Sequence, residues 1–207
     1  MKHEWRKHEK GLYIPKQKAE LIEVPEHKFL MLNGKGNPND EDFSERIGVL
    51  YSLAYDIRMM PRKGYTPEGY FEYTVYPLEG LWDLTEEGRN LDTLDKDELI
   101  YTIMIRQPEF VTKEVVDRAF ENVRKKKPHP LLDGVTFDTI KDGLSVQILH
   151  VGSYDNEAES FQIMKDFISE NNLEIVTLKH REIYLSDART ISLSINSMAW
   201  GLRFALN

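Results

Sequence analysis

The spacing of apolar residues predicts the first elements of a mixed α and β chain. Residues 20–32 are rich in β-forming side chains, with a break near Pro25, and predict a strand that runs into a turn at residues 33–38. From Phe43 the apolar residues recur at steps of three and four, which predicts a helix of about four turns ending before Pro61. The chain therefore begins with a strand, a turn and a helix.

Two further strands complete this first unit. Residues 71–78 and 99–105 are rich in β-branched and aromatic side chains, which favours β structure. Thr112 then predicts the N-cap of another helix, whose last turn carries the basic run 124–127 where the helix dipole favours cations. Pro128 and its neighbours predict a linker. The first half therefore reads β-α-β-β, followed by a connecting helix.

The second half repeats that order. A strand begins at Leu144, a helix carries Phe161, and residues 181–186 and 200–206 predict two more strands. Gly152 precedes Phe161 by nine positions, as Gly34 precedes Phe43 in the first half. Each half also carries an aliphatic residue, Tyr, two other residues and an acid, around Tyr76 and Tyr184. We interpret the pattern as a degenerate internal duplication.

The duplication predicts the fold class. We expect an α+β protein in which two pseudo-symmetric β-α-β-β modules form antiparallel sheet with helices and a central ligand groove, because junctions between like modules are preferred ligand sites. The whole chain, residues 1–207, is predicted to be one domain. Module one covers about residues 19–108, the connecting helix and linker 112–142, and module two 143–207.

Composition and charge exclude several classes of protein. The chain has 207 residues, a formal net charge of −8 and no cysteine, which excludes disulfides, thiolate metal sites and a cysteine nucleophile. The acidic balance argues against binding to nucleic acid. The longest run without Asp, Glu, Lys or Arg is residues 190–202, too short for a membrane span, and the charged N-terminus lacks a signal core. We therefore expect a cytoplasmic protein.

The histidines and glycines do not form the usual metal or nucleotide motifs. His3 and His8 are five residues apart, so they do not align on one helix face as zinc ligands. Gly34 and Gly36 lack the third glycine and the Lys-Ser/Thr of a nucleotide loop, and no serine lies in a Gly-x-Ser-x-Gly context. His150 could be a cleft residue or a satisfied core histidine. We expect no metal and no cofactor.

Glu182 is the principal candidate for chemistry. By the two-residue alternation of a strand, Glu182 and Tyr184 share one face, whereas Ile183 lies on the other face, which we expect to meet the helices. In a cleft, desolvation would raise the pKa of this carboxyl and suit it to proton transfer or to pairing with a cation. The alternative is an exposed carboxylate paired with Arg181 or Lys179.

Glu79 and Trp82 form a second candidate pole. A carboxylate beside an indole suits a planar ligand, with cation–π attraction if that ligand is charged. The alternative is that Trp82 closes the core edge and Glu79 is solvated. Tyr76, Tyr154 and Tyr184 are candidates for further aromatic walls and hydroxyl donors, although any one tyrosine of this kind is more often half-buried packing than a ligand contact.

Five segments resemble a known family, the stand-alone GyrI-like small-molecule-binding proteins. They are residues Glu4–Lys10, Gly34–Pro38, Tyr76–Trp82, Met104–Pro108 and His180–Asp187, of which the last is the most specific. In this superfamily, which includes the effector domains of multidrug-sensing transcription regulators, two β-α-β-β modules enclose a groove for large, flat, apolar and often cationic molecules. The resemblance implies that Glu182 is the carboxylate at the groove floor. With about 18 residues before the first strand, we expect no helix-turn-helix.

The resemblance implies two functions. Some stand-alone members are similar to hydrolases that detoxify DNA-alkylating natural products by opening a strained cyclopropane. Here Glu182 would be the catalytic residue that deprotonates water, while a Tyr hydroxyl or Glu79 steadies charge on the dienone oxygen. The alternative is a non-catalytic module that sequesters flat apolar or cationic drugs, or presents a ligand-dependent surface to a protein partner such as a gyrase. A purely structural role is a third possibility.

Overall fold

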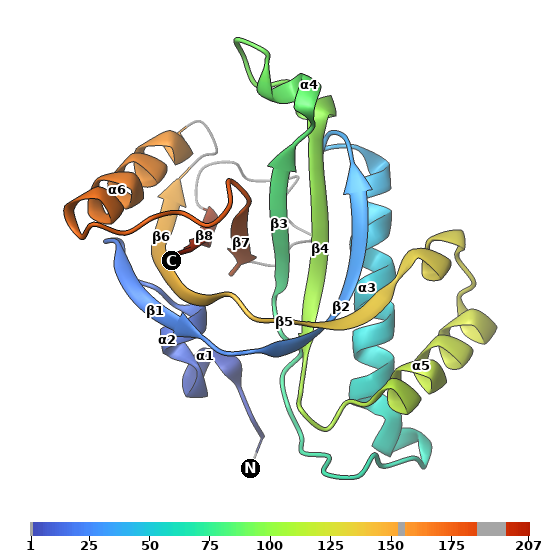
Figure 1. Cartoon of the computed structure of the whole chain (residues 1–207). Helices are drawn as coiled ribbons and strands as arrows, with labels where there is room; N and C mark the ends of the chain where they lie inside the picture. The colour runs from blue at the N-terminus through green and yellow to red at the C-terminus, as the bar shows by residue number, and fades with distance from the viewer. Residues whose placement is uncertain (1, 153–155, 186–197) are drawn as a thin grey trace.

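The computed structural model describes residues 2–152, 156–185 and 198–207. Eight strands form one antiparallel sheet in the order β1-β6-β8-β7-β3-β4-β2-β5, and the sheet curls into a half-barrel (Figure 1). The strands are β1 (Glu20–Val24), β2 (His27–Lys35), β3 (Leu78–Leu84), β4 (Leu99–Gln107), β5 (Thr136–Ile140), β6 (Gly143–Gly152), β7 (His180–Tyr184) and β8 (Met198–Ala205). The α-helices are α1 (Trp5–His8), α2 (Lys10–Tyr13), α3 (Glu41–Met59), α4 (Glu86–Arg89), α5 (Lys113–Lys126) and α6 (Glu157–Glu170). Three short 3₁₀ helices are η1 (Met60–Lys63), η2 (Lys96–Glu98) and η3 (Pro130–Gly134).

Local sequence accounts for several of these boundaries. Pro25 and the residue after it separate β1 from β2, because proline cannot donate to a strand ladder. After β2 the chain turns at Gly36, whose φ of 109° lies in the region that favours glycine. Thr112 caps α5 as predicted, since its side chain accepts a hydrogen bond from the backbone N–H of Val115.

The predicted fold class is confirmed, duplication included. β2-α3-β3-β4 and β6-α6-β7-β8 follow the same order, and the two units meet where β3 pairs antiparallel with β7. In this central ladder Gly80 lies opposite Glu182. The outer strands interlock the two halves, because β1 pairs with β6 of the second half and β5 pairs with β2 of the first.

The two faces of the sheet carry different layers. α3 packs against β2 and β4, and α6 packs against β6, so that both helices flank the central strands on one side (Figure 1). We call this side the groove face. α1 and α2 lie against the other side, where the Arg203 guanidinium of β8 donates to the backbone carbonyl of Leu12. We call this side the N-terminal face.

Some elements differ from the prediction. The strand expected at residues 71–78 begins only at Leu78, and the segment before it pairs through a single bridge between Tyr73 and His3. The pattern gave no sign of α1, α2 or β5, which lack the length or the alternation that marks a core element. No helix within the described ranges has the length and apolar character needed to cross a membrane.

Candidate functional site

A groove of about 420 Å³ lies between α3 and α6 over the central strands. Phe43 of α3 and Phe161 of α6 form its side walls, and β3 and β7 supply its floor. The lining is completed by Pro38, Asn39, Trp82, Asp83, Leu84, Arg89, Leu94, Lys96, Leu99, Glu157, Leu178, His180, Glu182 and Tyr184. Half of these are apolar or aromatic, as are both walls, and the acids Glu157 and Glu182 lie close together. This composition suits a small molecule with an apolar body.

Glu182 lies at the floor of the groove. Its residue is 5% exposed, and its Oε1 atom is 3.3 Å from Nε2 of His180 two positions earlier in β7. Glu182 and Tyr184 share the groove face, as predicted from alternation. The long helices α3 and α6 also lie on this face, so the expectation that Ile183 meets them on the opposite face is wrong. Arg181 is directed away from Glu182, so the pairing considered between them does not form.

A second carboxylate, Glu157, joins Glu182 in the groove. It is the first residue of α6, and its Oε1 accepts a hydrogen bond of 2.9 Å from the indole N–H of Trp200. Burial raises the pKa of Glu157 to about 7, and the negative charge of Glu182 adds to the effect. Two carboxyl groups with a tryptophan donor therefore form the polar end of an otherwise apolar groove.

Aromatic side chains hold the groove's shape. The indole N–H of Trp82 donates to the hydroxyl of Tyr184 over 3.0 Å, which ties β3 to β7 across the floor. Phe43 and Tyr101 pack against the same indole, with ring centroids 5.7 and 5.0 Å away. Gly80 leaves the necessary room, because a Cβ there would lie 2.6 Å from Nε1 of Trp82. Both Trp82 and Tyr184 therefore line the groove.

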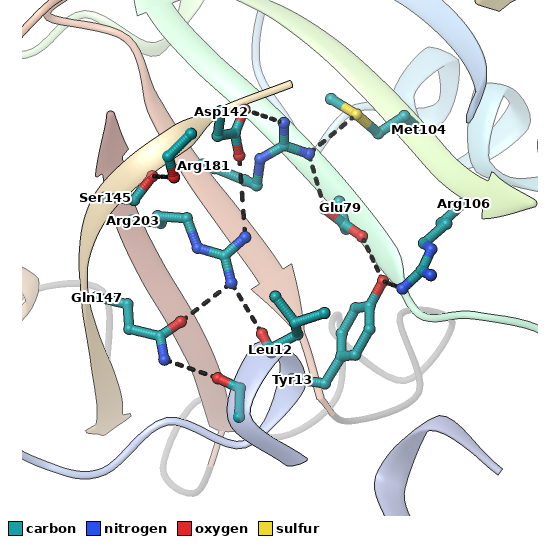
Figure 2. Close-up of polar contacts among 12 residues, drawn as sticks. Leu12, Tyr13, Glu79, Met104, Arg106, Asp142, Ser145, Gln147, Arg181 and Arg203 are labelled. Atoms are coloured by element: carbon teal, nitrogen blue, oxygen red, sulfur yellow. Dashed lines mark hydrogen bonds and ion pairs between the residues drawn. The ribbon is translucent and has the colours of Figure 1, made fainter. Parts of the chain in front are cut away.

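Glu79 does not line the groove but lies on the N-terminal face. Figure 2 shows its carboxylate between the guanidinium of Arg181, at 2.7 Å, and the hydroxyl of Tyr13, at 3.5 Å. Arg181 also pairs with Asp142 at 2.7 Å and is 3% exposed. The positive charge of Arg181 is thus neutralised on both sides by carboxylates.

This arrangement extends into a buried polar network. Arg203 donates to the side-chain oxygen of Gln147 over 3.0 Å and to a carbonyl of α2, and Arg106 donates to Tyr13 (Figure 2). Arg106 also pairs with Glu9. Tyr76 belongs to the same network, since its hydroxyl donates to Glu9 over 2.7 Å. The structure therefore separates Tyr76 and Glu79 from the groove by the thickness of the sheet.

The remaining candidates have different places. Tyr154 lies outside the described residues. His150 contacts Ser160 at 2.9 Å and packs at a tilt against Trp200 with ring centroids 4.4 Å apart, and its burial makes it a core histidine. His3 pairs with Glu9, and its ring stacks on that of His8 with centroids 5.0 Å apart.

The part of the chain that the structure describes contains one group with metal-ligand spacing. It consists of Glu157, His180 and Glu182, each of which offers a ligand atom within 4.8 Å of the other two. Sequence reasoning missed Glu157 and His180 as groove residues. The duplication contained a signal for Glu157, because it precedes Phe161 by four residues as Asn39 precedes Phe43, and all four of these residues line the groove.

Comparisons with known proteins agree with this architecture. Residues 17–196 match the model of the GyrI-like small molecule binding domain. Two crystal structures of a hydrolase from Listeria innocua are each 36% identical to the chain, with TM-scores of 0.88 and 0.90; the first covers 99% of this chain and all of its own, and the second covers all of both. No curated protein sequence matches.

A more distant structure shows the same fold. The C-terminal domain of EcmrR is 15% identical, with a TM-score of 0.52, and the match covers 95% of this chain and 98% of that domain. The family model spans most of the chain and both sides of the groove. The chain therefore belongs to the GyrI-like small molecule binding domain family.

Proposed function

We propose that the protein is a hydrolase that adds water to cyclopropane-bearing, DNA-alkylating compounds, with Glu182 as the base. The observation that carries the proposal is the buried Glu182 carboxylate at the floor of an aromatic groove of about 420 Å³. A cavity of this size holds a drug-sized flat molecule. The Listeria innocua structures, which match over the whole chain, are described as a hydrolase and support a hydrolytic reaction.

The proposed reaction assigns one step to each groove residue. Glu182 takes a proton from a water molecule, and the water oxygen bonds to the strained ring carbon as the ring C–C bond breaks. The electron pair of that bond moves to the dienone oxygen, which then takes a proton. We assign Tyr184, which lines the groove, to steady this oxygen, because Glu79 lies on the other face. A placed base contributes about 10²–10⁴-fold, and ring strain supplies much of the remaining driving force.

Mass spectrometry over a time course tests this function. A cyclopropanoid alkylator is incubated with the wild-type protein, with Glu182→Gln and with Glu159→Gln. Glu159 is an exposed carboxylate of the same helix as Glu157, so its substitution controls for loss of one charge. A water-addition product that accumulates over many turnovers is expected with the wild type and with Glu159→Gln. Full turnover by Glu182→Gln would refute the mechanism.

A second function, binding without turnover, is favoured by the apolar mouth of the groove. Leu94 and Leu178 line it and are 64% and 69% exposed, so a ligand can bury them without any reaction. In that case Glu182 neutralises a cation, and Glu182→Gln weakens binding of a cationic ligand far more than of its neutral isostere. Equal affinity of the wild type for both ligands would contradict this alternative.

A further inference from the structure

The acids of the groove floor are placed together with an imidazole. Nε2 of His180 and Oε1 of Glu182 are 3.3 Å apart, and Glu157 offers a third ligand atom within 4.8 Å of both. Two ligands of a tetrahedral zinc ion, bonded at about 2.0–2.1 Å, lie about 3.3–3.5 Å from each other. We propose that this carboxylate–imidazole cluster, Glu157, His180 and Glu182, binds one divalent cation of the Zn²⁺ class.

The surroundings of the cluster have the features that metal sites share. Trp200 donates to Glu157 over 2.9 Å and so orients one carboxylate from outside the cluster. The ring of His180 stands edge-on to Phe161, with centroids 5.0 Å apart, which fixes its plane. The groove gives the ion an entry path and leaves a coordination position open toward its interior.

The ligand types select the ion. Mg²⁺ and Ca²⁺ prefer sites made of oxygen alone, whereas an imidazole with two carboxylates suits Zn²⁺ and Co²⁺. The chain has no cysteine, so no thiolate competes for the ion. A divalent cation would also offset the repulsion between Glu157 and Glu182, which the protein otherwise accommodates in an apolar groove.

This inference goes beyond the proposed function, because binding an ion requires no catalysis. The ion site and the proposed catalytic site share one residue, Glu182. A bound ion would occupy the oxygen lone pairs that a base needs, so Zn²⁺ is expected to lower the rate of water addition and a chelator to restore it. Binding and turnover are therefore measured separately.

Calorimetry with Zn²⁺ and the visible spectrum with Co²⁺ test the site. The wild type is expected to bind one ion per chain, with the intense absorption of four-coordinate Co²⁺. Glu157→Gln and His180→Gln should lose that binding, whereas Glu159→Gln should retain it although the same charge is removed from the same helix.

Three outcomes would overturn the site: no saturable binding to the folded wild type, the weak spectrum of six-coordinate surface Co²⁺, or equal loss in Glu159→Gln. The titration of the wild type shows whether the ion site exists even if a variant fails to fold. Tight binding with unchanged turnover would leave the ion site standing and would count against Glu182 as the base.

Discussion

Consecutive residues of β7 lie in two different environments on the two faces of the sheet. Arg181 is directed to the N-terminal face, where Glu79 and Asp142 both pair with it at 2.7 Å. Glu182, the next residue, is directed to the groove face, where its neighbours are His180 and the open groove. Both side chains are buried. The charge of Arg181 is neutralised by the protein's own side chains, whereas the carboxylate of Glu182 faces a ligand-sized space.

The pKa shifts follow the same division. Burial lowers the pKa of Arg181, but the carboxylates of Glu79 and Asp142 outweigh it and hold the pKa above its usual value. Burial and the like charge of Glu182 both raise the pKa of Glu157. The N-terminal face thus brings Arg181 and Arg203 together but supplies Glu79 and Asp142 as their partners, whereas the groove brings the two carboxylates of Glu157 and Glu182 together. A pair of like charges costs stability, so its presence points to function.

Removing one carboxylate from each face gives the sharpest test of this division. Glu182→Gln is expected to reduce turnover by about 10²–10⁴-fold, because the base is lost. The melting temperature should be unchanged or higher, since repulsion with Glu157 is relieved. Steady-state rates and a thermal melt on the same preparation measure both. A large fall in melting temperature would show that Glu182 is a structural residue.

The matched change on the N-terminal face should act on stability instead. Glu79→Gln removes one partner of a buried ion pair, which typically costs about 3–5 kcal/mol of the free energy of unfolding. Urea denaturation measures this loss. Asp117→Asn is the control, since its pair with Lys113 is exposed and contributes about 0.3–0.5 kcal/mol. Equal losses in the two variants would contradict a buried network that holds the N-terminal face together.

The close approach of Trp82 to Gly80 can be disrupted by a substitution that removes no charged group. In Gly80→Ala the new Cβ would lie 2.6 Å from Nε1 of the indole, so Trp82 must move and its hydrogen bond to Tyr184 is strained. Overpacking of this kind typically lowers the free energy of unfolding by about 1–3 kcal/mol. Because Trp82 lines the groove, we also expect weaker ligand binding, which tryptophan fluorescence can measure.

Gly48→Ala is the control for that change. Gly48 lies in α3, and a Cβ there would meet nothing within 4 Å. Its substitution should leave the affinity for the ligand unchanged and improve helix stability by about 1 kcal/mol. If both alanines weakened binding equally, the close approach of Trp82 to Gly80 would have no part in shaping the groove.

The sequence predicted the residues whose position follows from local alternation. Glu182 and Tyr184 are two apart in one strand, so they share a face wherever that strand lies. Glu79 and Trp82 are three apart, and the sequence placed them on a connection. Because β3 starts at Leu78, alternation sends the two to opposite faces. The sequence-based placement of Glu79 beside Trp82 therefore failed because the strand was predicted at residues 71–78 and β3 begins only at Leu78.

Other features depend on tertiary contacts that a local pattern does not contain. β5 is an edge strand with mostly exposed or half-buried side chains, so no apolar face marks it. α1 and α2 are four residues each and are held by burial of Trp5 and Tyr13 against the sheet. The hydrogen bond that Trp200 donates to Glu157 joins residues more than 40 positions apart, so no local pattern contains it.

Among the substitutions that test the division between the faces, Tyr76→Phe is expected to have the smallest effect. Tyr76→Phe removes the hydroxyl that donates to Glu9 over 2.7 Å, and Glu9 keeps its partners His3 and Arg106. The loss of one such hydrogen bond should lower the free energy of unfolding by about 1 kcal/mol. Ligand affinity should not change, because the hydroxyl lies on the face away from the groove. Titration of one ligand into both proteins, beside urea denaturation, measures the two quantities. Weaker binding by the folded variant would mean that the network on the N-terminal face is coupled through the sheet to the groove.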